Sequence, residues 1–501
     1  MNNPENPPKM PSGGLIPDTP AAWFNNKFPG LSEKCGDPID EEKNKQGKSV
    51  VRGFSEDFFA TALGNKGCPA DPAVYIPTED RFFTYFPSDG IYIEQREQDL
   101  AAKISQLFLE CARACREASD VKNLEFGFRD AASLGGIIKK AKSALAVPNN
   151  YFSEKSQQII ICSNGVLRLA DKTLLPFSPE YRRRNRLNVN FDPAAKCPLF
   201  LDTLMHPALC PEKLDLLQRW CGLALVGINH AQKLIILTGT AGGGKGTFIR
   251  VLHGIIGSNN VGSLRTEQLA ERFEMGRMLG KTLLYGPDVP ENFLNCRGAS
   301  KLKALTGGDP VSVELKGSNE RPEIICRFNV IVTCNSRLKV HLEGDTDAWR
   351  RRLAIIEYGN SPPENQIADL SERILREEAS GVLNWMLEGL EKLRADNWQL
   401  NMSPRQAKTV ADLLLESDSQ NVFVSECLER EGTEGLNVAD CYEAYVDFAY
   451  QRGWASLPKN KFGPLICDAI VRKFAITQRN DIKDAAGKAQ RGWKGVKLKA
   501  A

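Results

Sequence analysis

The chain has 501 residues, of which 42% are apolar and 25% are charged. This composition is ordinary for soluble globular proteins, excludes a globally disordered chain, and leaves room for about three domains. The 65 basic residues nearly balance the 62 acidic ones, so any nucleic-acid site must be a local patch.

Several classes of protein are disfavoured from the start. No run approaches about 18 consecutive apolar residues, so we expect no membrane-spanning helix. The polar, Pro-rich N-terminus lacks the pattern of a signal peptide. The 14 cysteines include no Cys-x-x-Cys pair, and only four histidines are present. We therefore expect reduced thiols, no zinc site and a cytoplasmic location without a membrane partner.

The N-terminal part divides into an arm and a mixed domain. Residues 1–53 are rich in Pro, Asn and Gly and are predicted to be a disordered arm, in which Trp23, Phe24 and Phe28 could form a docking segment. A mixed α+β domain is predicted over 54–205. Its expected elements are a helix over 55–64, a hairpin over 74–94, a helix over 98–118 and short strands over 159–177.

The middle of the chain alternates short apolar strands with helical stretches, which predicts a parallel α/β sheet. A broad apolar helix over 211–230 precedes it. The strands are expected at 234–239, 282–286, 328–335 and 351–358. The predicted domains are an α/β core over 206–362, a helical connector over 363–417, and a small unit of helices and a terminal hairpin over 418–501.

The strongest motif follows the strand at 234–239. The spacing Gly239…Gly244–Lys245 fits the phosphate-binding pattern GxxxxGK. Glycines let backbone N–H groups turn inward around phosphates, the helix N-terminus adds partial positive charge, and the lysine reaches the β- and γ-phosphates. The expected ATP-binding residues are Gly239, Thr240, Ala241, Gly242, Gly243, Gly244, Lys245, Gly246, Thr247 and Phe248.

Magnesium is expected beside this loop. The residue after the lysine is Gly246, and the hydroxyl comes one position later, at Thr247, as in the GKGT loop of nucleoside monophosphate kinases. A P-loop NTPase also needs a carboxylate at the end of a neighbouring strand, and Asp288 supplies it. We expect Thr247 and Asp288 to hold Mg²⁺. Glu291 either polarises the attacking water or is a solvated loop residue.

Two further groups complete the expected catalytic set. The strand at 328–334 ends in Asn335, whose amide could bond the γ-phosphate or the attacking water. Three consecutive arginines then follow at 350–352 and cannot all face one way. We expect Arg351 or Arg352 to reach the nucleotide of a neighbouring subunit as an arginine finger. The predicted catalytic residues are Lys245, Asp288, Glu291, Asn335, Arg351 and Arg352.

The order of these motifs resembles superfamily 3 helicases, which are AAA+-type ring motors of viruses, phages and plasmids. The phage and poxvirus primase-helicase type is the most similar, over roughly residues 54–501. The additional matching segments are Asn164–Leu167, Phe191–Pro193, Cys197–Phe200, Leu305–Asp309 and Glu314–Gly317. The resemblance implies a P-loop AAA+-like motor with a mixed α+β N-terminal domain and a small C-terminal winged-helix domain.

The resemblance also implies cofactors and partners. It implies ATP and Mg²⁺, a hexameric ring, and 3′→5′ movement on single-stranded DNA. Many relatives carry a primase domain upstream, whereas only about 50 residues precede the fold here. The chain therefore looks like the helicase part alone, with a separate primase or polymerase as partner.

DNA contacts are expected at two places. In the resembling family, a hairpin before the Asn strand places a lysine on DNA phosphates, which implies Lys316 and Gly317; the alternating pattern around this turn independently predicts a hairpin. Residues 458–501 carry a net charge of +8, and Lys459, Lys461 and Lys494 are the candidates there. The arginine cluster at 182–186 is expected to be solvated or to lie between subunits.

The main hypothesis is an ATP-dependent ring helicase that separates forked DNA during replication of a phage, plasmid or other mobile element. Two alternatives stay open. The GKGT loop also suits a small-molecule phosphotransferase. The same motifs suit an ATP-gated DNA-binding, origin-recognition or defence NTPase that does not unwind DNA.

Overall fold

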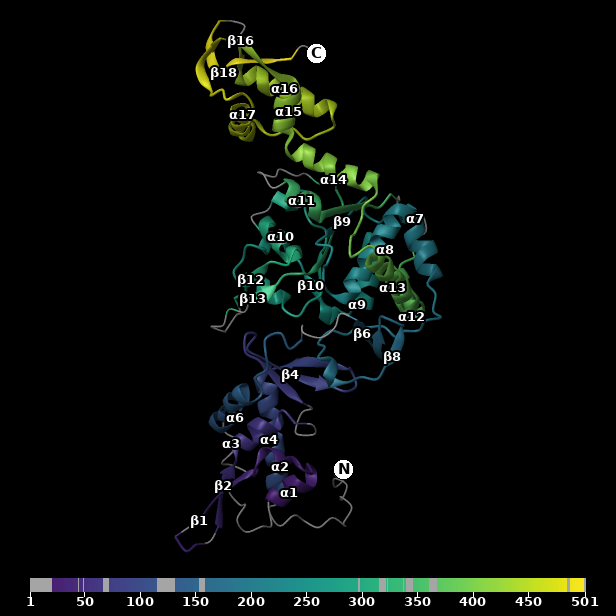
Figure 1. Ribbon diagram of the computed structural model, residues 1–501, viewed down its shortest axis with the longest axis vertical. Coiled ribbons are helices and arrows are strands. Elements are labelled where there is room, and N and C mark those ends of the chain that lie inside the picture. The colour runs from purple at the N-terminus through teal and green to yellow at the C-terminus, as the bar shows by residue number, and fades with distance from the viewer. Residues whose placement is uncertain are drawn as a thin grey trace, which may run out of the picture. The chain divides into compact units, whose positions relative to one another are not determined.

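The computed structural model describes residues 20–43, 45–47, 49–65, 72–114, 131–152, 158–295, 298–314, 321, 323–336, 338, 346–359, 367–483 and 487–499. The chain forms two compact units (Figure 1). The N-terminal unit comprises residues 1–186 with 314–322, and the C-terminal unit comprises residues 187–313 with 323–501.

The boundary between the two compact units lies after residue 186. The segment after it bonds to the C-terminal unit: the Asn188 amide donates to the Ile255 carbonyl over 2.9 Å. The amides of Leu199 and Phe200 each donate to the Glu378 carboxylate over 2.8 Å. These bonds satisfy the first donors of a π-helix, Leu199–Met205, and attach it to the downstream helices.

The N-terminal unit contains helices and three small antiparallel sheets, ordered β1-β2, β3-β4-β5 and β6-β7-β8. Its helices are α1 (Pro20–Lys27), α2 (Leu31–Cys35), α3 (Glu56–Ala62), α4 (Glu97–Ala114) and α6 (Ala131–Ala144). Its strands are β1 (Ile39–Lys43), β2 (Ser49–Phe54), β3 (Ala73–Ile76), β4 (Arg81–Phe86), β5 (Ile91–Gln95), β6 (Ile159–Cys162), β7 (Gly165–Arg168) and β8 (Thr173–Leu175). This is the predicted mixed α+β composition.

The predicted disordered arm over 1–53 is wrong for its described part, from residue 20 onward. Phe24 on α1 is only 1% exposed, and its ring centroid lies 5.4 Å from that of Phe59 and 6.0 Å from that of Phe54. Trp23 and Phe28 pack against the same core while partly exposed. The prediction rested on the Pro- and Asn-rich composition. Burial of aromatic side chains, at about 25 cal/mol per Å² of apolar area, stabilises the described part of this segment in spite of that composition.

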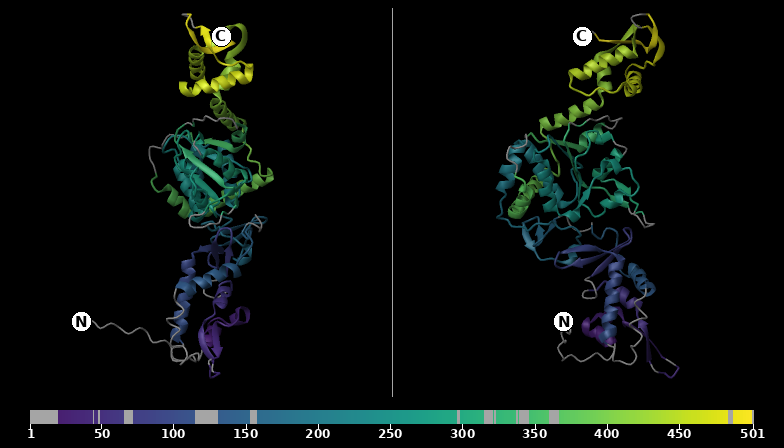
Figure 2. Two further views of the ribbon diagram at one scale, coloured as in Figure 1. Left: turned by 90° about the vertical axis from the view of Figure 1, so that its left-hand side faces the viewer. Right: turned by 180° about the vertical axis from the view of Figure 1, so that it is seen from behind.

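The C-terminal unit is built on a five-stranded parallel sheet in the order β10-β11-β14-β9-β15. The strands are β9 (Leu234–Thr238), β10 (Val261–Ser263), β11 (Leu283–Gly286), β14 (Asn329–Cys334) and β15 (Leu353–Glu357). Figure 2 shows helices packed around these strands. The sequence predicted the parallel sheet and every strand except the short β10.

The helices of this unit follow the strands in the predicted alternation. They are α7 (His206–Ala208), α8 (Pro211–Val226), α9 (Lys245–Ile256), α10 (Ala299–Gly307), α11 (Thr346–Arg352), α12 (Leu370–Glu377), α13 (Ala379–Ala395) and α14 (Pro404–Ser417). A two-stranded pair, β12 (Pro310–Ser312) and β13 (Glu323–Ile325), completes this part. Helices α8 and α13 lie backbone to backbone, because a Cβ on Gly389 would lie 2.1 Å from the Gln218 carbonyl oxygen.

The segment from residue 418 onward has three helices and an antiparallel sheet in the order β16-β18-β17. The elements are α15 (Ser419–Cys427), β16 (Leu428–Asn437), α16 (Val438–Gln451), α17 (Lys459–Phe474), β17 (Arg479–Lys483) and β18 (Ala489–Leu498). Trp493 of β18 is fully buried in a core with Tyr445 and Phe462. The terminal hairpin was predicted, whereas β16 was not.

No helix of the described ranges is long and apolar enough to cross a bilayer.

Candidate nucleotide site

The phosphate loop joins β9 to α9, and its glycines at 239, 242 and 244 have positive φ angles that other residues adopt only with strain. Gly239 has φ +132°, and a Cβ there would lie 2.5 Å from the carbonyl oxygen of Tyr358. Gly244, at the N-cap of α9, has φ +97°. The loop therefore curves tightly back on the start of the helix, with its backbone free of side chains at these turns. This is the cradle that a phosphate group requires.

Lys245 is held over this loop. Its Nζ donates to the carbonyl oxygens of Gly239 over 2.6 Å and Thr240 over 2.9 Å. Burial lowers the pKa of Lys245, and the nearby charge of Asp288 opposes that shift. Both hydrogen-bond acceptors are neutral carbonyls, so phosphate oxygens can replace them as stronger, charged acceptors. The residues thus fit the phosphates of a nucleotide.

The predicted carboxylate and amide meet at the carboxyl ends of adjacent strands. Asp288 follows β11, Asn335 follows β14, and the Asn335 Nδ2 donates to the Asp288 Oδ1 over 3.1 Å. Asp288 has φ +40°, a conformation that Asp tolerates better than most residues. The Thr333 hydroxyl on β14 accepts from the Asp288 backbone amide over 2.9 Å and holds this turn. Sequence reasoning missed Thr333, whose only signal was its place two residues before Asn335.

Glu291 belongs to the same electrostatic neighbourhood. Burial chiefly raises the pKa of the Cys334 thiol; the charges of Glu291 and Asp288 raise it further, and that of Lys245 lowers it. Cys334 ends β14, so these three charged groups gather around the carboxyl end of the strand that lies between β9 and β11. The structure therefore brings Asp288 and Asn335 into direct contact, and Glu291 follows Asp288 by three residues along the chain.

The arginines at 350–352 have three different environments. Arg352 is buried, and its guanidinium donates to the carbonyls of Ala348 over 3.1 Å and Lys303 over 3.3 Å. Arg350 pairs with Asp347 over 2.8 Å, and Arg351 is exposed. The buried Arg352 guanidinium attaches α11 to α10, so the exposed Arg351 is the more accessible of the two arginines predicted as the finger.

Three other predicted ATP contacts lie in the first turn of α9. Phe248 has a side chain in the core and a backbone amide that donates to the Gly244 carbonyl over 3.0 Å, so neither group is placed for a nucleotide. The Thr247 hydroxyl accepts from the Arg250 Nη2 over 3.2 Å. Gly246 is exposed, and a Cβ there would meet only the Arg250 Nη1, at 3.7 Å.

The candidate DNA contacts divide into two groups. Lys316 and Gly317 lie outside the described residues, but β12 and β13 on either side of them pair antiparallel, in agreement with the predicted hairpin. Lys459 and Lys461 are exposed at the start of α17, and Lys494 is exposed on β18.

The arginine cluster of the N-terminal unit has partners within that unit, and its side chains are partly buried rather than fully solvated; the alternative place between subunits stays a prediction. Arg184 pairs with Glu79 over 2.8 Å, and Arg186 pairs with Asp89 over 2.6 Å. Burial lowers the pKa of Arg183. These cations are used in packing their own unit.

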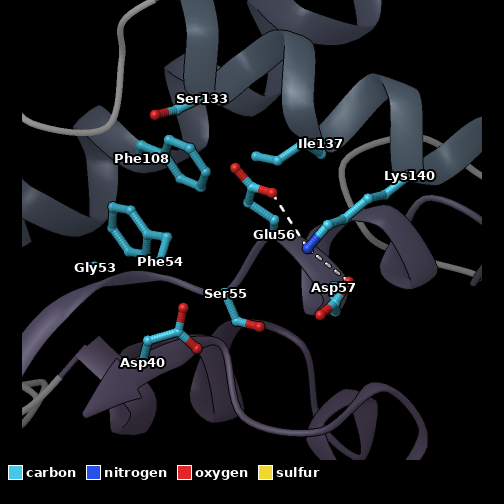
Figure 3. A pocket seen from close by; sticks show the side chains of 10 residues that line it. All are labelled: Asp40, Gly53, Phe54, Ser55, Glu56, Asp57, Phe108, Ser133, Ile137 and Lys140. Carbon is cyan, nitrogen blue, oxygen red and sulfur yellow. Dashed lines mark ion pairs between the residues drawn. The ribbon is translucent and has the colours of Figure 1, made fainter. Parts of the chain in front are cut away.

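A cavity of about 330 Å³ lies in the N-terminal unit, between β1, β2, α3, α4 and α6 (Figure 3). Its apolar side is formed by Phe54, Phe108 and Ile137. Its one lysine, Lys140, binds the carboxylates of Glu56 and Asp57. The described residues form no cluster of His, Cys, Asp or Glu that could hold a metal ion.

Comparisons with known proteins match two segments of the chain. Residues 237–352, from β9 through the three arginines, match a family of unknown function, DUF5906. Residues 77–206 match the family described as D5 N terminal like.

Solved structures with some likeness include the apo structure of the NrS-1 C terminal region (305–718). It is 12% identical, with 85% of this chain and 96% of that chain covered and a TM-score of 0.47. An A form of the same region has a TM-score of 0.46, at 12% identity and the same coverage. JCV helicase with a bound small molecule is 17% identical, with 43% of this chain and 66% of that chain covered and a TM-score of 0.23. These TM-scores are below 0.5, so the function is inferred from the residues of the site.

Proposed function

We propose that the protein is an ATP-dependent DNA helicase that acts as a ring. The observation that carries this proposal is that Lys245 is held over the phosphate loop after β9, while Asp288 and Asn335 bond to each other after the parallel strands β11 and β14. A phosphate cradle supplies ATP binding, a carboxylate supplies the magnesium side, and an amide beside it can orient the attacking water. The match of residues 77–206 to the D5 N terminal-like family agrees with this proposal.

The roles of the residues follow from their places. The loop from Gly239 to Gly244 and Lys245 bind the phosphates, Asp288 holds Mg²⁺, and Glu291 or Asp288 activates water. Asn335 senses the γ-phosphate. Bound ATP and its magnesium ion supply the phosphoryl chemistry, while these side chains bind, orient and neutralise.

The exposed Arg351 is the proposed finger, reaching the nucleotide of the next subunit in a hexamer. Arg351→Ala is expected to lower ATP hydrolysis by about 10³-fold, the effect of losing such a finger, with unchanged thermal unfolding. Arg352→Ala, the matched control, is expected to cost about 1–3 kcal/mol of unfolding free energy, because it leaves buried carbonyl groups without their donor. An equimolar mixture of the Lys245→Ala and Arg351→Ala proteins should recover part of the activity, since some interfaces then carry both intact groups. Full ATP hydrolysis by Arg351→Ala alone would exclude the finger, and so would the absence of any recovered activity in the mixture.

The DNA-binding parts are proposed as two elements. The segment between β12 and β13, which includes Lys316 and Gly317, is proposed to move single-stranded DNA through the ring in the 3′→5′ direction. The segment from residue 418 onward is a winged-helix domain with α17 against DNA and Lys459, Lys461 and Lys494 on phosphates. Substitution of any of these lysines that contacts a phosphate should reduce the salt dependence of DNA binding by about one unit of slope. A separate primase or polymerase is the proposed partner.

The test is ATP-dependent unwinding of a forked duplex, with ATP hydrolysis followed in parallel. Lys245→Ala should lose both activities, whereas Lys316→Ala should keep basal hydrolysis and lose unwinding. If the wild-type protein hydrolyses ATP but never separates strands, with or without a primase, the helicase function is excluded. The ATP-gated DNA-binding function would then replace it.

A further inference from the structure

We infer that Arg250 is a second cation of the phosphate site, and that Thr247 acts with it on a phosphate oxygen instead of binding Mg²⁺. The inference rests on the nucleotide binding proposed above. It replaces the predicted role of Thr247 as a metal ligand and adds a phosphate contact that the motif does not contain.

The helix geometry separates Thr247 from the usual metal position. In the common phosphate loop, the hydroxyl that binds Mg²⁺ directly follows the lysine. That position is Gly246 here, and it has no side chain. Because α9 has 3.6 residues per turn, the Thr247 side chain leaves the helix about 100° around the axis from position 246. The hydroxyl therefore faces a different set of neighbours.

The Thr247 hydroxyl faces the side chain of Arg250. A helical side chain leans toward the N-terminus of its helix, so Arg250 runs back over the first turn of α9. Its Nη2 donates to the Thr247 hydroxyl over 3.2 Å, and its Nε donates to the Ser371 hydroxyl over 3.0 Å. Among the described residues, no carboxylate forms an ion pair with Arg250. The guanidinium is thus oriented by two neutral hydroxyls at the mouth of the phosphate loop.

The chemistry of the hydroxyl favours phosphate over metal. A threonine oxygen has one hydrogen to donate and two lone pairs. With Arg250 on one lone pair, a magnesium ion on the other would lie beside a guanidinium, and the two cations repel. A phosphate oxygen is attracted by both groups, because it accepts from the hydroxyl and from the guanidinium. Asp288 then remains the carboxylate for Mg²⁺.

The second anchor of Arg250 is rigid. Ser371 is 4% exposed on α12, which packs directly on α9. A Cβ on Gly254 of α9 would lie 2.4 Å from the Leu375 side chain, so the two helices are in close contact. Ser371 is therefore a positioning residue, and its loss should have a smaller effect than the loss of the arginine.

The experiment measures equilibrium binding of a fluorescent ATP analogue to the full chain, once with Mg²⁺ and once with EDTA. Arg250→Ala and Thr247→Ala are expected to weaken binding about tenfold in both conditions, as for the loss of a hydrogen bond to a charged group. Ser371→Ala should weaken it less. Arg373→Ala on the same helix, whose partner is Glu377, is the control and should bind as wild type.

Three results would overturn the inference. Wild-type affinity in Arg250→Ala under both conditions would exclude the phosphate contact. A loss in Thr247→Ala that disappears in EDTA would return Thr247 to the metal. A Tm decrease in Arg250→Ala with full affinity in a well-folded Arg250→Gln protein would reduce Arg250 to a structural role. Failure of the proposed function looks different, because the wild type would not bind ATP or Lys245→Ala would bind it equally well.

Discussion

Two lysines, each beside a cavity or loop, show what makes a cation available to a ligand. Lys245 donates to two backbone carbonyls, whereas Lys140 in the N-terminal unit lies 3.2 Å from the Glu56 carboxylate and 2.9 Å from that of Asp57 (Figure 3). Carbonyl acceptors leave the positive charge available for a phosphate, while two carboxylates compensate it. A lysine marks an anion site when its hydrogen-bond partners are neutral.

The backbone near Lys245 also favours anion binding, whereas the backbone near Lys140 does not. Gly239 and Gly244 have positive φ angles and wrap the chain into a cradle near Lys245. Near Lys140, Gly136 lies within the regular helix α6 and lines no cradle. A binding loop therefore needs both an uncompensated cation and a backbone that exposes its N–H groups.

The largest expected effect comes from removing each lysine in turn. Lys245→Ala should weaken ATP binding by at least about 100-fold, because two hydrogen bonds to a charged phosphate are lost. Lys140→Ala should leave ATP affinity unchanged. Calorimetric titration with ATP measures both. Equal losses in the two variants would break the distinction between the lysines.

The next effect compares the two glycines. Gly239→Ala places a Cβ 2.5 Å from a backbone oxygen at positive φ, so we expect a loss of about 1–3 kcal/mol of unfolding free energy together with ATP binding. Gly136→Ala places a Cβ 2.7 Å from the Glu56 Oε1, the movable end of a side chain. Its unfolding free energy should stay within about 1 kcal/mol of wild type, since alanine favours a helix. Chemical denaturation checks both, and a stable Gly239→Ala protein would contradict the steric argument.

A smaller effect depends on pH. Burial lowers the pKa of Lys245, whereas the carboxylates of Asp57 and Glu56 raise that of Lys140. ATP binding requires the charged ammonium, so affinity should fall as pH rises through the lowered pKa of Lys245. Binding at alkaline pH should then take up a proton, which calorimetry in buffers of different ionisation enthalpy detects. Proton release, or no exchange, would argue that the ammonium does not contact phosphate.

The smallest expected effect is that neutral partners for Lys140 do not create ATP binding. The double variant Glu56→Gln with Asp57→Asn gives Lys140 neutral partners, as Lys245 has. Without a glycine cradle it should still bind no ATP in an isolated N-terminal segment or in the full chain carrying Lys245→Ala. Measurable ATP binding in that background would show that neutral partners allow a lysine to bind ATP without a glycine cradle.

The sequence predicted the features that depend on neighbours along the chain. The phosphate loop is contiguous, and its glycine spacing specifies its backbone before any tertiary contact forms. Most strands of the parallel sheet were identifiable because each is a short, mainly apolar run between helical stretches. The missed strands are β10, which has three residues, β16, which has a bulge and polar residues, and β1 and β2, which lie in or at the end of the predicted disordered arm.

The tertiary structure decided which distant residues meet. The Asp288–Asn335 bond joins residues 47 apart, and the Arg250–Ser371 bond joins residues 121 apart. Burial separated Arg352 from Arg351 and placed Phe24 in a core, although the local composition around each residue was polar. Strand order and side-chain burial arise from packing of the whole chain, and no local pattern encodes them. The sequence by itself therefore determined the chemistry of the loop, and the fold decided which charges surround it.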